Sequence, residues 1–401
     1  MLTRQGWGAV VLAVVIGVIG RMFGVLELFV MGAGILALVA ATALWVHARP
    51  IRLEVHRTAV PSALQVGETG RIELRLTNLT KGGTSPLVLW EPVAGMGGAT
   101  LRLAPMRRAE TTSAHYRLPA TRRGTVTFGP LVVERRDPFG LSTLRRVMPG
   151  THEVIVLPAH FALALPTGAG GAGPLGQHLR MRSLGRSGSE FHSLREYVEG
   201  DDLRRINWRA SARSETLKVR EVEPDGLRRC CVTLDTTADE YSLDGFERAV
   251  SAAASAIASA DRAALQLRLL IGATVDLRNT SLNAALYRLA DCSVSAAETP
   301  SFNAPSGEGL GLNIVVTGSA GSLAVAAARR SLNPNDVLVV IACTTMTSQN
   351  GTFVIDATDD TEFARSWAEM TGTADLSLTP RPPRSSRSSR PSRQASMTNA
   401  S

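Results

Sequence analysis

Residues 188–223 hold the densest group of side chains able to bind another molecule. Arginines and acidic residues alternate closely there, with an asparagine and a tryptophan among them: Arg195, Glu196, Glu199, Asp201, Asp202, Arg204, Arg205, Asn207, Trp208, Arg209 and Arg213. Guanidinium groups pair bidentately with carboxylates, so these residues can neutralise one another and fix the segment onto a folded body. They can also form a docking surface, because Arg and Trp are enriched at interface hot spots. The interleaved acids would repel phosphate, so we expect no nucleic-acid partner.

Motifs of the common catalytic classes are absent from the sequence or incomplete. The sequence has no Walker loop of the form G-x-x-x-x-G-K-[ST], so any ATPase must be another chain. Gly185–Gly188 misses the nucleophile elbow by one position, and the four cysteines have neither zinc nor disulfide-framework spacing. His192 and Glu196 lie four residues apart without an apparent third metal ligand. We therefore expect a protein that is not an enzyme and has no cofactor.

Composition places the chain among folded, multi-domain proteins. Its 401 residues are 44% hydrophobic and 19% charged, which is too apolar for disorder throughout. The net charge of +8 comes largely from five arginines in one Ser/Pro-rich tail, residues 376–401, which is expected to be disordered. The basic isoelectric point therefore carries little information about partners.

Two apolar segments open the chain. Residues 28–46 run 19 residues without a charge, close to the ~20 that cross a bilayer as a helix. Residues 7–20 are uncharged for 14 residues, and residues 22–26 extend them if Arg21 snorkels. We expect a transmembrane hairpin over residues 6–47, with helices near 6–24 and 28–46. A signal peptide is the alternative, but no A-x-A-like cleavage site follows.

Basic residues indicate how this hairpin is oriented. They flank its outer ends, whereas the connector carries only Arg21 and Glu27; the flanking residues are Arg4, His47, Arg49, Arg52 and Arg57. By the positive-inside rule both termini lie in the cytoplasm. The sequence thus predicts a multi-pass protein of the cytoplasmic membrane, in contact with lipid, with its soluble part on the cytoplasmic side.

Residues 50–158 have the pattern of an all-β domain. Apolar and polar residues alternate in short runs separated by Gly, Pro and Asn turn signals, which predicts an antiparallel sandwich of immunoglobulin-like type. Its last strands follow an Asp-Pro-Phe-Gly-Leu turn at residues 137–141. The Gly-rich residues 159–187 then predict a linker.

Residues 188–375 predict an α/β domain. Phe191, Leu194 and Val198 fall at helical spacing, so a helix ending at Gly200 is expected. From Cys230 onward strands and helices alternate, which is typical of a mostly parallel sheet covered on both faces. Ligands in such folds lie at the carboxyl ends of strands, so residues 235–239 are the first place to look for one.

The central segment resembles the domain-of-unknown-function 58 family. The resemblance rests on a long run of residues: Phe191, Leu194, Arg195, Glu196, Tyr197, Gly200, Asp201, Asp202, Arg204, Ile206, Trp208, Ser211, Ala212, Arg213, Leu217, Val219 and Glu221. It implies a membrane hairpin, a β-sandwich and a von Willebrand A-like (Rossmann-type) domain, which together cover roughly residues 1–375. It also implies a non-enzymatic adaptor that works beside MoxR-type AAA ATPases in the assembly or maturation of other proteins.

The von Willebrand A resemblance implies a place for Mg²⁺. Such domains hold the ion with an Asp-x-Ser-x-Ser turn and a further Asp, and hard oxygen ligands suit this cation. Here Asp235 and Thr237 are usable, but Asp239 replaces the second Ser, and Gly318 stands where the later Asp is expected. We expect a degenerate, structural turn that binds the ion weakly if at all.

These observations predict a membrane-anchored adaptor that recruits a partner protein, most specifically an AAA ATPase. The partner-binding residues are expected to be Arg195, Glu196, Tyr197, Asp201, Asp202, Arg204, Asn207, Trp208, Ser211 and Arg213. Two other function classes stay open. One is a membrane-associated hydrolase with an unrecognised site, and the other is a binder of anionic ligands or nucleic acid through the Arg-rich segment and tail.

Overall fold

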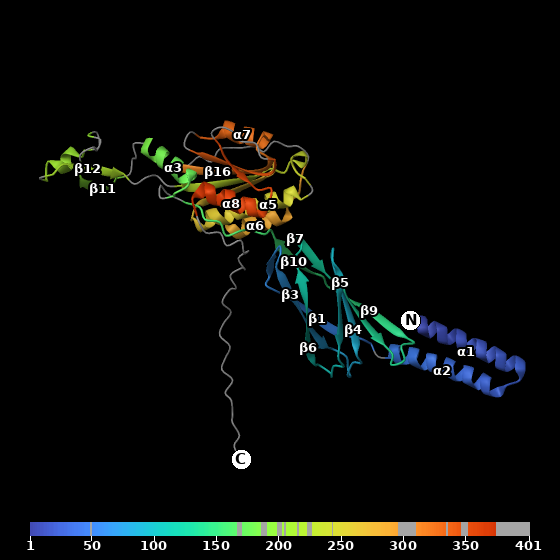
Figure 1. Cartoon of the computed structure of the whole chain (residues 1–401). Helices are drawn as coiled ribbons and strands as arrows, with labels where there is room; N and C mark the ends of the chain where they lie inside the picture. The colour runs from blue at the N-terminus through green and yellow to red at the C-terminus, as the bar shows by residue number, and fades with distance from the viewer. Residues whose placement is uncertain are drawn as a thin grey trace, which may run out of the picture. The chain divides into compact units, whose positions relative to one another are not determined.

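The computed structural model describes residues 1–48, 50–166, 171–185, 191–198, 203, 206–214, 216–222, 227–242, 244–295, 310–333, 336–345 and 352–373. The chain divides into two units, Met1–Leu157 and a second that starts at Pro158. The first contains a helical hairpin and a β-sandwich, and the second contains an α/β body and a small β-hairpin (Figure 1).

The chain opens with two antiparallel apolar helices, α1 (Arg4–Phe23) and α2 (Leu26–Ala48). Thr3 caps α1 by accepting the Gly6 N–H at 3.0 Å, and Gly24 ends it in the left-handed conformation. Both helices are long and apolar enough to cross a membrane. Most of their large apolar side chains are exposed, among them Val11, Leu12, Val30 and Leu44. A helix that is apolar all round and exposed needs a lipid environment, so these helices indicate membrane association.

Two sheets, antiparallel except for the parallel pair of β2 and β10, form the sandwich that follows. The smaller sheet has the order β1-β3-β6, and the larger has β2-β10-β7-β4-β8-β9 with β5 paired to β4. The bounds are β1 Leu53–Val60, β2 Ala63–Gln65, β3 Thr69–Asn78, β4 Leu87–Val93, β5 Gly97–Leu103, β6 Thr111–Pro119, β7 Gly124–Phe128, β8 Leu131–Arg136, β9 Thr143–Met148 and β10 His152–Leu157. Alternate side chains of both sheets, such as Leu74, Leu89 and Phe128, fill the space between them. The predicted β-sandwich is therefore confirmed.

A buried ion pair interrupts this apolar core. Alternation along β1 and β4 puts Arg57 and Glu91 on the inward faces, and Arg57 Nε donates to Glu91 Oε1 at 2.6 Å. Their side chains are only 6% and 0% exposed. Tyr116 Oη donates to the other Glu91 oxygen at 2.9 Å. The charge of Arg57 is therefore neutralised inside the folded sandwich, and its part in orienting the hairpin stays a prediction.

The second unit is built on a six-stranded sheet with the order β15-β14-β13-β16-β17-β18. Its strands are β13 Leu227–Leu234, β14 Gln266–Ile271, β15 Val275–Arg278, β16 Leu310–Ser319, β17 Val337–Thr345 and β18 Phe353–Asp356. All pair in parallel except the edge strand β15. The helices are α5 Gly245–Arg262, α6 Leu282–Asp291, α7 Leu323–Ser331 and α8 Asp360–Thr371, with α7 on one face and the others opposite (Figure 1). The predicted mostly parallel, doubly covered sheet is confirmed.

Residues 159–187 do not form a simple linker. Helix α3 (Pro174–Gly185) lies within this range, and its Leu175 and Leu179 are buried. Phe161 and Leu163 are also buried, and the Phe161 N–H donates to Ser255 of α5 at 2.9 Å. The linker prediction is wrong here because the few apolar residues between the glycines reach the helical layer of the α/β body.

Candidate functional site

The Asp/Arg/Trp segment contains a two-stranded antiparallel sheet. Strand β11 (Phe191–Glu196) pairs with β12 (Lys218–Val222), with Glu196 opposite Lys218. The predicted helix over residues 191–198 is wrong, because pairing with a strand some 20 residues later satisfies this backbone instead. Residues four apart on a strand are separated by roughly 13 Å, so the helical spacing on which a shared metal ion at positions 192 and 196 depended is lost.

Polar contacts lie at the end of this hairpin where the connecting segment joins the two strands. Lys218 Nζ donates to Glu196 Oε1 at 3.0 Å, and Thr216 Oγ1 donates to the same oxygen at 3.1 Å. These donors lower the pKa of Glu196. The Tyr197 N–H donates to the Leu217 carbonyl at 2.8 Å. Glu196 and Tyr197 therefore help to hold the hairpin together.

A one-turn helix, α4 (Trp208–Ser211), is fastened to β12. Asn207 caps it by accepting the Ala210 N–H at 3.2 Å, and the Asn207 N–H donates to the Lys218 carbonyl at 2.8 Å. Ser211 Oγ accepts the Lys218 N–H at 2.8 Å. Ile206 and Val219 form a bridge and are both buried. Asn207 and Ser211 thus position α4 and are less available for a partner.

Several large side chains of the segment are exposed to solvent. Trp208 is 67% exposed, and Arg195, Arg209 and Arg213 are exposed as well. Large apolar side chains of the same segment are also exposed: Leu194, Val198, Leu203 and Leu217. The predicted site residues Asp201, Asp202 and Arg204 lie outside the described residues. The segment therefore presents an aromatic residue on a fixed helix, among exposed aliphatic and basic residues.

The predicted metal turn is filled by internal hydrogen bonds. Asp235, buried after β13, accepts from Thr237 N–H and Oγ1 at 3.0 and 2.7 Å, and from Thr317 Oγ1 at 2.9 Å. Asp239 is exposed. In the part of the chain that the structure describes, no three His, Cys, Asp or Glu side chains are grouped to hold a metal. One carboxylate with two hydroxyls fits a hydrogen-bonded turn better than a closed Mg²⁺ site.

Residues 193–276 match the family model described as protein of unknown function DUF58. The chain is a DUF58 protein. The matched region, which we call the DUF58 segment, begins in β11 and includes α4, β12, β13, α5 and β14. It therefore contains the exposed Trp208 as well as Asp235.

Solved structures match parts of this DUF58 protein only at low identity and low TM-score. A CARDB domain from Pyrococcus furiosus, determined in solution, is 16% identical with a TM-score of 0.21, over 26% of this chain and 93% of that one. The crystal structure of the same domain in complex with di-metal ions is 13% identical with a TM-score of 0.20, over 27% of this chain and 86% of that one. The alkylpurine DNA glycosylase AlkC of Pseudomonas fluorescens is 13% identical with a TM-score of 0.19, over 29% of this chain and 34% of that one. No curated protein matches the sequence.

The sequence reasoning missed two residues beside Asp235. Thr317 donates to its carboxylate from β16, and Glu240 lies close enough for the two carboxylates to interact electrostatically. A Thr at the end of a strand neighbouring β13 was a usable signal, because the carboxyl ends of parallel strands meet at one edge of a sheet.

Replacing Glu240 with Gln is expected to stabilise the second unit at neutral pH. Burial, and then the charges of Asp235 and Asp239, raise the pKa of the Glu240 carboxyl. A carboxyl with a raised folded-state pKa binds its proton more tightly when folded. Its favourable contribution is therefore present at low pH and is lost as pH rises through the window between the unfolded and folded pKa values.

Thermal unfolding of wild type and Glu240→Gln from about pH 4 to pH 7 checks this, since Glu titrates near the lower end of that range. The melting temperature of the variant should fall less than that of wild type as the pH rises. Glu369→Gln, which removes a carboxylate 68% exposed on α8, is the control. Parallel pH profiles for wild type and Glu240→Gln would contradict the expectation.

Proposed function

We propose that this DUF58 protein is a membrane-anchored docking protein, without catalytic activity of its own, whose DUF58 segment binds a partner protein. The observation that carries the proposal is Trp208, a tryptophan 67% exposed on a helix fixed by hydrogen bonds that the Asn207 and Ser211 side chains accept. Fixing the backbone that carries an exposed aromatic side chain reduces the entropy cost of binding. Tryptophan and arginine are also the residue types that most often dominate interface energies.

A MoxR-type AAA ATPase is the partner class we propose, and assembly or maturation of other proteins is the process. The family resemblance supplies this expectation. It agrees with the lack of a Walker loop in the sequence, since a protein of this kind would rely on another chain for nucleotide hydrolysis. The exposed arginines at positions 195, 209 and 213 favour an acidic surface on that partner.

We also propose that α1 and α2 span the cytoplasmic membrane and that both termini lie in the cytoplasm. Arg4, His47 and Arg52 are exposed at the outer ends of the hairpin, whereas the connector region holds Arg21 and Glu27. Even without Arg57, the outer ends of the hairpin carry more basic residues than the connector does. The second unit is proposed to be von Willebrand A-like, which is supported by its strand order and by Asp235 at the carboxyl end of β13.

Affinity capture of the full chain from native membranes tests the docking role. Trp208→Ala is expected to reduce recovery of the AAA ATPase at least about tenfold, since loss of a hot-spot tryptophan costs 2 kcal/mol or more. The matched control is Leu323→Ala on α7, which removes an apolar side chain 71% exposed outside the DUF58 segment. Equal recovery with Trp208→Ala, or equal loss with Leu323→Ala, would contradict the proposed function.

A further inference from the structure

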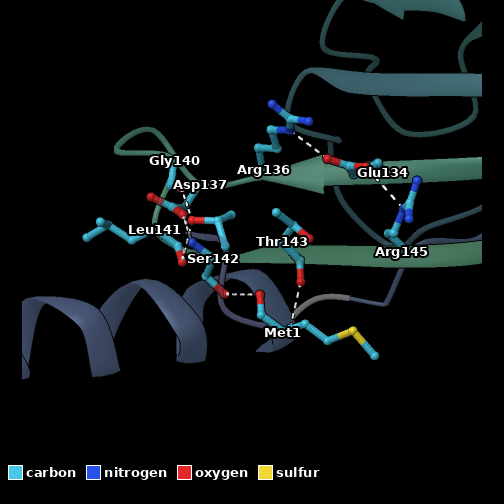
Figure 2. A network of polar contacts seen from close by, with 10 residues as sticks. Met1, Glu134, Arg136, Asp137, Gly140, Leu141, Ser142, Thr143 and Arg145 are labelled. Atoms are coloured by element: carbon cyan, nitrogen blue, oxygen red, sulfur yellow. Dashed lines mark hydrogen bonds and ion pairs between the residues drawn. The ribbon is translucent and has the colours of Figure 1, made fainter. Parts of the chain in front are cut away.

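Backbone hydrogen bonds join the residues before α1 to the Asp-Pro-Phe-Gly-Leu turn of the sandwich (Figure 2). The Thr3 N–H donates to the Leu141 carbonyl at 3.0 Å, and Thr3 Oγ1 donates to the Gly140 carbonyl at 2.6 Å. The Thr143 N–H donates to the Met1 carbonyl at 2.8 Å. We call residues 1–6 together with 137–145 the joint.

The turn within the joint has its own internal support. The Asp137 carboxylate accepts the N–H groups of Phe139, at 2.8 Å, and of Ser142. Gly6 leaves room for the turn, since a Cβ there would lie 2.1 Å from the Leu141 carbonyl oxygen. Arg135 of β8 holds the end of α2 to the larger sheet by donating to the Val46 carbonyl at 3.4 Å. The position of the turn relative to the membrane helices is therefore fixed.

This position is the depth at which the hydrocarbon layer would begin. Thr3 is the cap of α1, and the turn is bonded to Thr3 directly. Phe139, at the tip of the turn, is 62% exposed. Trp7 and Trp45, near the start of α1 and the end of α2, are 61% and 45% exposed. Aromatic side chains at that level are typical of a membrane–water interface.

Basic residues surround the same place. Arg4, Arg136, Arg145 and Arg146 are all exposed, and Glu134 is the acidic residue between them. Glu134 accepts from Arg136, and its other oxygen lies 3.2 Å from Arg145 Nε (Figure 2). Four exposed arginines against Glu134 and the buried Asp137 leave this surface basic. Basic residues near an anionic lipid surface strengthen its binding electrostatically.

We propose that the joint is a membrane-contact surface for anionic phospholipids. Phe139 enters the interfacial layer, and Arg136 and Arg145 bind lipid headgroups, so that the sandwich itself rests on the bilayer. The inference depends on the proposed membrane anchoring of α1 and α2, and it adds a lipid class and a second point of attachment to it.

Fluorescence of the full chain in vesicles tests the contact. An environment-sensitive dye is attached at Phe139→Cys or at Val60→Cys, with Cys292 replaced by Ser because the other three cysteines are buried. Val60 is 53% exposed at the end of β1 remote from α2, so it is the matched control. The dye at position 139 should shift to the blue and be quenched by spin-labelled lipid, and the dye at position 60 should not. Equal, water-like emission at both positions would overturn the proposal.

A charge test identifies the lipid class. Blue shift and quenching at position 139 should be greater in phosphatidylcholine vesicles containing phosphatidylglycerol than in phosphatidylcholine alone. The double variant Arg136→Gln/Arg145→Gln should abolish that difference, whereas Arg71→Gln, an exposed arginine on β3 opposite Val60, should retain it. Quenching that is independent of phosphatidylglycerol in the wild type would overturn the headgroup assignment. Extraction of the chain from vesicles by alkaline carbonate would instead show that the anchoring proposal had failed.

Discussion

Replacing Arg57 with Ala is expected to lower the free energy of unfolding of the sandwich by about 3–5 kcal/mol, since it leaves a buried carboxylate without its counter-charge. Glu91 is fully buried, and Arg57 and Tyr116 are its hydrogen-bonding partners at 2.6 and 2.9 Å. Burial, followed by the charge of Glu91, raises the pKa of the Tyr116 phenol, so the phenol remains a donor. One neutral donor does not replace a guanidinium.

Chemical denaturation of the full chain in lipid nanodiscs measures this loss. The matched control is Arg75→Ala, which removes an exposed arginine 3.9 Å from Glu73 on β3 and should cost at most about 1 kcal/mol. The double variant Arg57→Met/Glu91→Leu removes both charges and should recover most of the stability lost in Arg57→Ala. Similar unfolding midpoints for Arg57→Ala and Arg75→Ala would contradict a stabilising role of the pair.

Gly318→Ala is expected to destabilise the second unit by about 3 kcal/mol or more, at the upper end of overpacking effects. A Cβ at this position would lie 1.7 Å from the backbone carbonyl oxygen of Glu240. Backbone cannot rotate away as a side chain can, so the 3-10 turn Ala238–Glu240 would have to move. That turn follows Asp235 and carries Asp239, so the displacement would disturb the whole Asp235 region.

Thermal unfolding compares this variant with Ser319→Ala, which changes the next residue of β16 without adding volume. The melting temperature should fall clearly for Gly318→Ala and little for Ser319→Ala. Equal melting temperatures would mean that the turn adapts without cost. The same contact explains why no Asp stands at position 318, since the Glu240 carbonyl occupies the space that its side chain would need.

Much of the fold could be predicted because local patterns and tertiary contacts agree. The uncharged runs predicted α1 and α2 to within a few residues, and alternation predicted the sandwich. Alternation also held a signal that was missed. Arg57 and Glu91 fall on the inward positions of β1 and β4, between apolar residues, and two opposite charges on inward faces must pair. Treating Arg57 only as a charge beside the hairpin overlooked its inward-facing position in the alternating pattern of β1.

The errors lie where a distant segment decides the local structure. Phe191, Leu194 and Val198 satisfy a helical period, but Leu194 lies opposite Arg220 in a strand pair that no single window contains. Residues 174–185 were expected in a linker because of their glycines, whereas burial of Leu175 and Leu179 supports a helix. Asn207 caps α4, and Ser211 accepts a hydrogen bond from β12; binding of a partner by these two residues stays a prediction.

A photo-crosslinking amino acid with a large aromatic side chain in place of Trp208, which keeps an aromatic group at that position, tests the central claim most directly in the full chain and in native membranes. The account predicts a covalent adduct with an AAA ATPase, formed at position 208 and absent when the crosslinker stands at Leu323 of α7. Both positions are highly exposed, so accessibility alone does not distinguish them. No protein adduct at position 208, or the same adducts at both positions, would contradict a docking role for the DUF58 segment.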